Sequence, residues 1–171
     1  PLELIYHALT LKQLGHSVKF YDLQANPENI KFFFNDFNEA KNSICIVLVT
    51  TPTLENDISF LHQINKKNIN SRIFVRFSLK NTNIIRNILD LGIVEKVLFG
   101  ETEMIIGDII ENNTDDGTAY LKNDEVFLGK NIVIEDMNGL PDLNLDFIDF
   151  SRYTYVLLPK GNGNFFTFQS S

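Results

Sequence analysis

The chain is poor in the residues that build most catalytic and metal sites. Its 171 residues include one cysteine, three histidines and no tryptophan. A single cysteine excludes an internal disulfide, a Cys-x-x-Cys motif and a cysteine metal cluster within this chain. Cys45 lies in the apolar run ICIVLVT, which favours a buried and unreactive thiol.

Basic residues and long hydrophobic runs are also scarce. Fifteen Lys and Arg residues stand against 22 Asp and Glu residues, and the formal net charge is −7. Phosphate binding needs a basic surface, so we expect no nucleic-acid partner. No apolar run approaches the roughly 18 residues of a membrane-spanning helix, and no signal-peptide pattern is present. We therefore expect a protein without a membrane span that resides in the cytoplasm.

Motifs that carry common chemistries are missing as well. No Gly-x-Gly-x-x-Gly follows a strand pattern, and neither a P-loop nor a Gly-x-Ser-x-Gly elbow occurs. These absences disfavour a dinucleotide site, a P-loop site and a self-contained hydrolase. The histidines His7, His16 and His62 have no second histidine or carboxylate at ligand spacing, so we expect structural or surface roles for them. The sequence therefore predicts no catalytic residue and no metal ligand.

What is present is a regular alternation of helical and strand patterns. The chain is 44% hydrophobic and 22% charged, as globular domains are. Strand patterns cover 17–22, 43–50, 72–78 and 95–99, and helical patterns cover 1–15, 26–40, 51–68, 80–92 and 101–113. This order predicts an α/β fold, a Rossmann-like or flavodoxin-like doubly wound parallel sheet with helices on both faces. The helix that precedes the first strand pattern normally follows a strand of its own.

The pattern changes after Asn113. NNTDDG is turn chemistry, and GTAYLKNDEVFLG predicts a β-hairpin that turns at Asn123-Asp124. The rest is extended and acidic, then aromatic, and reads as a linker arm. We therefore divide the chain into a domain at 1–113 and a hairpin with its arm at 114–171. Because the chain opens on a helical pattern without a methionine and stops at FFTFQSS, we expect a fragment of a longer protein.

Candidate binding residues follow the strands of this sheet. In an open parallel sheet, ligands bind beyond the carboxyl ends of the strands. The loops expected there carry hydroxyls and amides rather than histidines, namely Thr50, Thr51, Thr53, Ser78 and Asn81. The stretch GETE adds Glu101 and Glu103, which are either acid–base catalysts or residues of a helix's first turn, with Thr102 as a cap. Carboxylates interact well with the positive end of a helix, so the pattern favours the second interpretation.

The order of these parts resembles a known family. PLELIYHALTLKQLGHSVKFYDL is similar to the opening of the cobalamin-binding-type domains that precede radical S-adenosylmethionine (radical SAM) barrels. The stretch VEKVLFGETEMIIGDII resembles that family's strand ending in Gly-Glu-x-Glu, AYLKNDEVFLG its short hairpin, and IEDMNGLPDLNLDFIDFSRY its acidic arm. In such proteins a segment like FFTFQSS precedes the cysteine motif of the iron–sulfur cluster. The opening matches at Pro1, Leu2, Leu4, Tyr6, Gly15, His16, Val18 and Asp22.

The resemblance implies the N-terminal cobalamin (B12)-binding-type domain of a radical SAM enzyme, cut before the barrel and without catalysis of its own. The partner would be the C-terminal radical SAM domain of the same protein, which would hold a 4Fe–4S cluster and S-adenosylmethionine. If cobalamin binds, the resemblance places its tail near six residues of the carboxyl edge. They are Thr50, Thr51, Thr53, Ser78, Gly100 and Glu101.

The chain also departs from the family pattern. The Asp-x-His-x-x-Gly loop that supplies the cobalt ligand is absent, and Phe77-Ser78 stand where the family often has a Gly-Gly pair. Side chains there would crowd a backbone approach that glycine permits. One interpretation is therefore a degenerate domain that keeps the fold without the cofactor. A second is a flavodoxin-like or receiver-like binding or regulatory module without a radical SAM partner. A third is a stand-alone enzyme, although the sequence lacks a nucleophile–base set.

Overall fold

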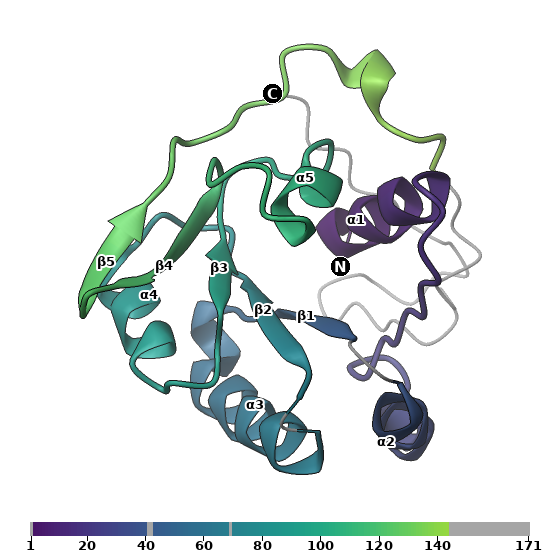
Figure 1. The fold of residues 1–171 in the computed structure, drawn as a ribbon. Helices are drawn as coiled ribbons and strands as arrows, with labels where there is room; N and C mark the ends of the chain where they lie inside the picture. The colour runs from purple at the N-terminus through teal and green to yellow at the C-terminus, as the bar shows by residue number, and fades with distance from the viewer. Residues whose placement is uncertain (1, 41–42, 69, 144–171) are drawn as a thin grey trace, which may run out of the picture.

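The sheet of this domain is mixed, with three parallel strands followed by an antiparallel hairpin. The computed structural model describes residues 2–40, 43–68 and 70–143. Strand order in the sheet follows the chain, from β1 to β5 (Figure 1). The expected α/β class is confirmed, and the parallel part comprises three strands. The parallel strands are β1 (Ile44–Leu48), β2 (Arg72–Arg76) and β3 (Lys96–Leu98), and the hairpin strands are β4 (Thr118–Lys122) and β5 (Glu125–Leu128).

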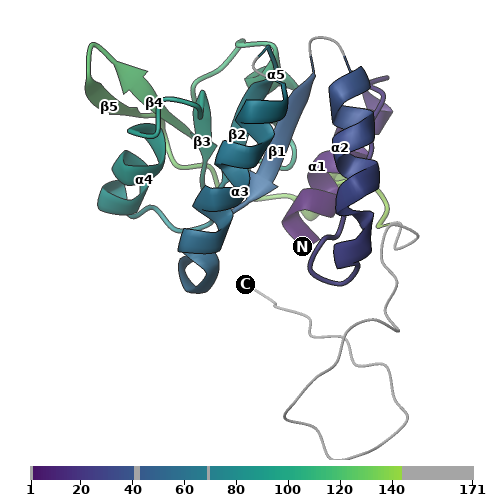
Figure 2. The ribbon, with the colours of Figure 1, turned by 90° about the horizontal axis from the view of Figure 1, so that it is seen from below.

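Helices cover both faces of the sheet. Helices α1 (Leu2–Gln13) and α5 (Ile106–Ile110) pack together on one face, and α3 (Leu54–Lys67) and α4 (Thr82–Leu89) cover the other. Helix α2 (Ile30–Glu39) lies beside α3, as Figure 2 shows. Across the described residues, no helix is both long and apolar enough to cross a bilayer.

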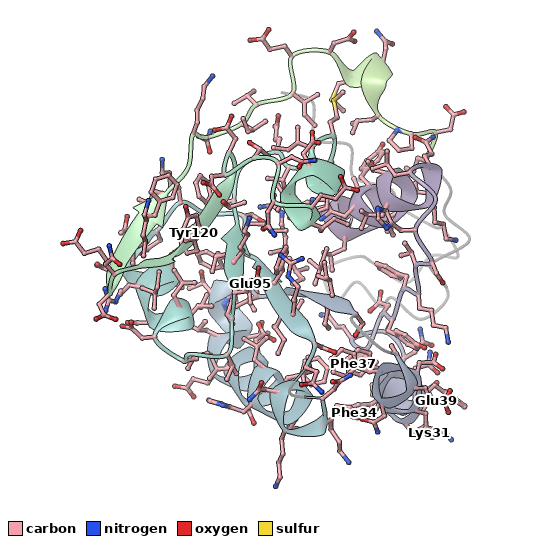
Figure 3. The ribbon with its side chains drawn as sticks, in the orientation of Figure 1. Lys31, Phe34, Phe37, Glu39, Glu95 and Tyr120 are labelled. Carbon is pink, nitrogen blue, oxygen red and sulfur yellow. The ribbon has the colours of Figure 1, made fainter. Side chains whose placement is uncertain are left out.

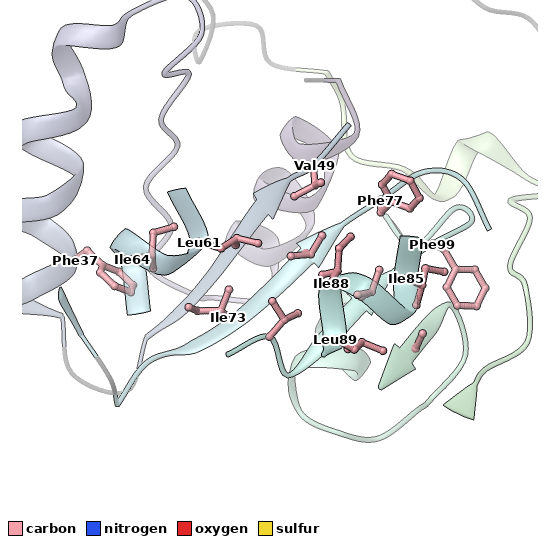
Figure 4. Close-up of a cluster of buried hydrophobic side chains, with 14 residues drawn as sticks. Phe37, Val49, Leu61, Ile64, Ile73, Phe77, Ile85, Ile88, Leu89 and Phe99 are labelled. Carbon is pink, nitrogen blue, oxygen red and sulfur yellow. The ribbon is translucent and has the colours of Figure 1, made fainter. Parts of the chain in front are cut away.

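Each face has its own apolar core. The larger one joins α3 and α4 to the sheet through residues such as Leu61, Ile85 and Phe99 (Figure 4). The smaller one joins α1 and α5 to the sheet through Leu11 and Ile106. Because side chains alternate along a strand, Ile73 and Val75 of β2 enter the larger core while Phe74 enters the smaller one. This two-sided burial explains why the parallel strands read as continuous apolar runs.

The predicted hairpin turn is confirmed in detail, and a side chain caps α4. Asn123 and Asp124 have φ values of 51° and 63°, as a type I′ hairpin turn requires, and β4 and β5 flank them. The Asn81 side chain accepts from the backbone N–H groups of Asn83 and Ile84 and so caps α4. The hairpin pairs with β3, so the sheet continues across residue 113. The division into 1–113 and 114–171 stays a prediction.

The strand expected at 17–22 is wrong. These residues form neither helix nor turn, and they belong to no sheet within the described residues. The apolar alternation of SVKFYDL is present, since Val18 and Phe20 are half-buried and Ser17 and Lys19 are exposed. A strand also needs a neighbour for its backbone hydrogen bonds, and among the described residues β1 pairs with β2 alone. The predicted apolar alternation is therefore present, but alternation alone does not reveal whether a neighbouring strand forms hydrogen bonds with the segment.

The helix expected at 101–113 is also too long. Helix α5 begins at Ile106, and residues 101–105 form a turn in which the Ile105 N–H donates to the Thr102 carbonyl at 3.2 Å. Glu101 and Glu103 thus precede the helix instead of lying in its first turn, and the Thr102 side chain does not cap it. The expected arm beyond residue 143 lies outside the described residues.

Candidate functional site

The three predicted threonines form the start of α3 at the carboxyl edge of the sheet. The Thr50 N–H and the Thr53 hydroxyl both donate to Asp57 Oδ2, at 3.1 and 2.6 Å. The hydroxyl oxygens of Thr50 and Thr53 lie 2.8 Å apart. Thr51 is exposed on the short turn between them. Two of the three hydroxyls are therefore already used to hold the loop onto its helix.

Ser78 joins the end of β2 to the start of α1. Its hydroxyl lies 3.0 and 2.9 Å from the two carboxylate oxygens of Glu3 and donates to that carboxylate. The same carboxylate lies 3.1 Å from Arg76 Nε, which is close enough for an ion pair but not aligned for a hydrogen bond. Because Glu3 belongs to α1, these contacts fix the beginning of that helix at the carboxyl edge.

Arg76 is the centre of this edge. Its side chain is only 3% exposed, yet it carries a charge. Nη1 donates to the Leu98 carbonyl at 3.2 Å, and Nη2 donates to the Gly100 carbonyl at 2.6 Å. The guanidinium therefore ties the end of β2 to the end of β3 and to α1. Arg76 was not among the predicted site residues, although an arginine inside the apolar run RIFVRF indicates a buried charge that needs partners.

A histidine and a glutamate are buried beside Arg76. His7 Nε2 lies 3.0 Å from the Thr102 hydroxyl, and both residues are at most 1% exposed. Burial, helped by the Arg76 charge, lowers the pKa of His7 to about 3, so the imidazole is neutral at neutral pH. Burial raises the pKa of Glu103, and Arg76 partly opposes that rise. The expected structural role of His7 agrees with this position.

Three polar atoms in this cluster lack a hydrogen-bond partner among the described residues. They are His7 Nδ1, Arg76 Nε and Glu103 Oε2, and all three are inaccessible to solvent. Buried polar atoms are usually satisfied, so such atoms carry a desolvation cost. His7 contacts a hydroxyl, Thr102, whose own role is to hold α1 to the loop. The cluster therefore supports a structural junction, because the one hydroxyl that lies beside an imidazole here, Thr102, is buried together with His7 where a substrate cannot reach them.

Gly100 and Glu101 hold the segment that follows the hairpin. The Glu101 N–H donates to the Ile132 carbonyl at 2.9 Å, and the Glu101 carboxylate accepts from the Ile134 N–H. Gly100 has a φ of 67°, and a Cβ there would lie 2.8 Å from Asn131 Oδ1 and 2.9 Å from the Ile132 carbonyl oxygen. Only glycine fits a backbone approached so closely. We call residues 130–134 the return segment, because they cross back over the carboxyl end of β3.

These contacts test whether the predicted residues fit a cobalamin tail. The hydroxyls of Thr50 and Thr53 bind within the α3 start, and Ser78 binds Glu3. The Gly100 carbonyl binds Arg76, and Glu101 binds the return segment. Apart from the exposed Thr51, their polar groups are engaged inside the protein, and the space beside Gly100 is filled by protein atoms. In this arrangement the residues do not fit the cofactor.

The structure brings only part of the predicted set together. Ser78 and Gly100 are linked through Arg76, with Glu101 next to them along the chain. Among the described residues, no hydrogen bond joins Thr50 or Thr53 to that group. No three His, Cys, Asp or Glu side chains within the described ranges form a group that could hold a metal ion.

A second polar site lies at the opposite edge of the sheet. A hollow of about 280 Å³ near the amino end of β3 is lined by Glu95, Lys96, Asn112, Asp115, Tyr120 and Leu121. Figure 3 shows Glu95 and Tyr120 in this region. Lys96 Nζ lies 3.9 Å from Asp115, and the Tyr120 hydroxyl donates to the same carboxylate at 3.0 Å. Burial lowers the pKa of Lys96. Lys96 and Asp115 thus pair with each other within this hollow. The hollow lies away from the edge where ligands bind to parallel sheets.

Comparison with known proteins does not identify a family for this domain. The described residues form an α/β domain with a mixed five-stranded sheet and a buried Arg76 junction at its carboxyl edge. No family model, no curated protein and no solved structure matches the chain.

Proposed function

We propose that this chain is a non-catalytic N-terminal domain of a radical SAM enzyme, a degenerate relative of the cobalamin-binding-type domains. The proposal rests on the family resemblance of the sequence and on one observation from the structure. The carboxyl edge, where a cofactor would lie, is occupied by the protein's own side chains and by the return segment.

The return segment supports a linking role for this edge. The chain leaves the hairpin, and the Gly117 N–H donates to the Lys130 carbonyl at 2.7 Å. It then binds Glu101 through the backbone of Ile132 and Ile134. The polypeptide that leads onward is therefore anchored on the rim of the sheet. A catalytic domain that follows it would be held close to this rim.

The composition of the edge supports the absence of catalysis in this domain itself. Arg76 is committed to two backbone carbonyls and to Glu3. His7 is neutral and buried against Thr102. General acid–base catalysis needs a group within reach of a substrate proton and with a pKa near the working pH. Neither the position nor the pKa of His7 meets that requirement.

The test uses the parent protein, with the residues that naturally follow Ser171. We expect a Cys-x-x-x-Cys-x-x-Cys motif shortly downstream, an iron–sulfur absorption band after anaerobic reconstitution, and reductive cleavage of S-adenosylmethionine. Titration with hydroxocobalamin should leave the corrin spectrum unchanged, and no corrinoid should co-purify. A corrin shift or a bound corrinoid would overturn the degenerate assignment and would support cobalamin binding.

The absence of the cysteine motif and of the cluster would instead contradict the radical SAM assignment. The alternative is then the flavodoxin-like or receiver-like binding or regulatory module. A Glu101→Lys variant provides a sharper probe, because it removes the acceptor for the Ile134 N–H. We expect it to slow cleavage of S-adenosylmethionine while cluster content stays intact. Glu125→Lys, an exposed change on β5, is the matched control and should leave cleavage unchanged.

A further inference from the structure

The outer edge of β1 is an unpaired sheet edge. In a parallel ladder, alternate residues direct both backbone groups toward the same neighbour. Ser43 accepts from the Arg72 N–H, and the Val49 N–H donates to the Arg76 carbonyl. The odd-numbered residues of β1 therefore face β2, and Ile44, Ile46 and Leu48 direct their backbone groups to the other side. β1 ends the strand order, so no strand among the described residues pairs there.

The residues of β1 are also less buried than those of the other parallel strands. All five residues of β1 are only half-buried, although the strand reads Ile-Cys-Ile-Val-Leu. Four of the five residues of β2 and all three of β3 are buried. Apolar strands of parallel sheets are normally covered on both faces and flanked by neighbours. An exposed apolar edge of this kind is a template for pairing with a further strand.

Residues 17–22 pack on the same apolar core as β1. They form neither helix nor turn, and Val18 packs against the smaller apolar core, which also takes Ile44 and Ile46. Ser17 and Lys19 point outward. In Figures 1 and 2, the chain between α1 and α2 runs beside those helices and stands away from β1. The segment thus has strand periodicity and a core-facing side without belonging to the sheet.

The direction of α1 fixes the direction of a strand that would feed it. Glu3, near the start of α1, contacts Ser78 and Arg76 at the carboxyl end of β2. A strand leading directly into α1 must therefore end at this same edge, parallel to β1. From β1 to β2 the chain crosses by α3 on one face. A move in the opposite direction by α1, on the other face, has the same right-handed sense, as crossovers in such sheets require.

We propose that a strand from the polypeptide immediately upstream of Pro1 pairs with the outer edge of β1 and fills the position between β1 and residues 17–22. It runs parallel to both, and residues 17–22 then form the outermost strand of the sheet. Since helices cover both faces here, the inserted stretch should be about five residues long and apolar throughout. The proposal is independent of any cofactor.

Tethering favours this occupant over a second copy of the chain. An upstream strand enters α1 directly, so its effective concentration at the edge is high. A second copy would have to bring its own β1 to an edge that α1 and α2 flank (Figure 2). The inserted strand also explains why residues 17–22 alternate like a strand but lie apart from β1. Its neighbour would be the inserted strand and not β1.

The test is amide hydrogen exchange on residues 1–171 and on the same chain with its natural upstream residues. In the longer protein, the Ile46 and Leu48 amides should exchange about a hundred-fold more slowly, because they gain partners. The Cys45 and Val47 amides already face β2 and serve as internal controls. Unchanged exchange at Ile46 and Leu48 would overturn the proposal.

A second measurement covers the case in which the longer protein fails to fold. The upstream segment, made as a synthetic peptide, is titrated into the ¹⁵N-labelled chain of residues 1–171. Saturable shifts at Ile44, Ile46, Val18 and Phe20 are expected, and no shift at these positions would refute the strand. Protection at Ile46 that grows with protein concentration in residues 1–171 would instead assign the edge to a second copy.

Discussion

The two ends of strand β2 carry the same residue type in opposite surroundings. Arg72 and Arg76 lie on one face of the strand, on either side of Phe74, whose ring Arg72 covers at 5.0 Å. Arg72 forms a two-pronged pair with Glu95 at 2.7 and 2.6 Å, with its side chain 31% exposed. Arg76 is buried and binds backbone carbonyls of another strand.

The comparison shows that the stability gained from a charged side chain depends on which partner groups its removal leaves unpaired. At the amino end, water can solvate Glu95 if Arg72 is lost, because the carboxylate is 39% exposed. At the carboxyl end, loss of Arg76 would leave the Leu98 and Gly100 carbonyls without their donor in a dry environment. Arg72 also donates to the Ile110 carbonyl at 2.8 Å, at a partly exposed position that water can reach, whereas Arg76 holds the carboxyl rim together in a dry environment.

Removal of the buried arginine should have the largest effect. We expect Arg76→Ala to lower the free energy of unfolding by about 3 kcal/mol, since one partner of a buried polar network is lost. Arg72→Ala is the matched control and should cost about 1 kcal/mol or less. Urea denaturation of both variants measures the difference. Equal losses would mean that the two ends of β2 are energetically alike.

Two glycines extend the comparison to β3. Gly92 precedes this strand and Gly100 follows it, with φ values of 68° and 67°. Nothing lies within 4 Å of a Cβ at Gly92, whereas a Cβ at Gly100 would collide with Asn131 and Ile132. We expect Gly100→Ala to cost about 2–3 kcal/mol and Gly92→Ala about 1 kcal/mol, measured by thermal and urea unfolding. A smaller cost at Gly100 would contradict the close packing of the return segment.

The buried histidine should make the carboxyl end sensitive to acid. Since the pKa of His7 is about 3 in the folded protein and near 6.5 when unfolded, the unfolded chain binds the extra proton between these values. Stability from this group is present above pH 6.5 and falls as the pH drops, by about 2 kcal/mol from pH 7 to pH 5. Burial raises the pKa of Glu103, which contributes in the opposite direction at acidic pH.

Variants separate the histidine from its neighbours. His7→Gln should flatten the loss of stability between pH 7 and pH 5, measured by urea unfolding at a series of pH values. His62 is exposed on α3, so His62→Gln should retain the wild-type slope. The same slope in both variants would show that another group sets the acid response.

The smallest effect belongs to the exposed carboxylate. Glu95→Gln keeps one acceptor oxygen for Arg72, replaces the other with an NH2 group and removes the charge, so we expect a loss of at most about 1 kcal/mol that becomes smaller at high salt. Urea unfolding at low and high ionic strength measures it. A loss that persists in high salt would mean that the amino end of β2 is also a structural junction.

Much of the local structure could be predicted because it depends on nearby residues. Asn123-Asp124 specify their own turn through positive φ, and Asn81 caps the helix that it begins. The apolar runs located all three parallel strands. Residues 17–22 were misassigned because a strand is defined by its neighbour, which periodicity does not reveal.

The carboxyl edge was predicted in part for the same physical reason. The rule for parallel sheets placed Ser78 and Gly100 at one rim, where Arg76 now links them. Arg76, Glu3 and His7 were not chosen, since their importance comes from contacts between residues 22 to 95 positions apart. Glu101 was expected at a helix start and instead holds the return segment, a contact 33 residues along the chain.

The alkylation rate of the single thiol can be used to follow β1. Burial raises the pKa of Cys45 to about 12, and only the thiolate reacts readily with alkylating reagents. Cys45 is half-buried on β1, the strand with the unpaired outer edge, so its alkylation rate in the folded protein reports how well that strand is covered. With no other cysteine in the chain, the total rate of thiol loss belongs to this one position.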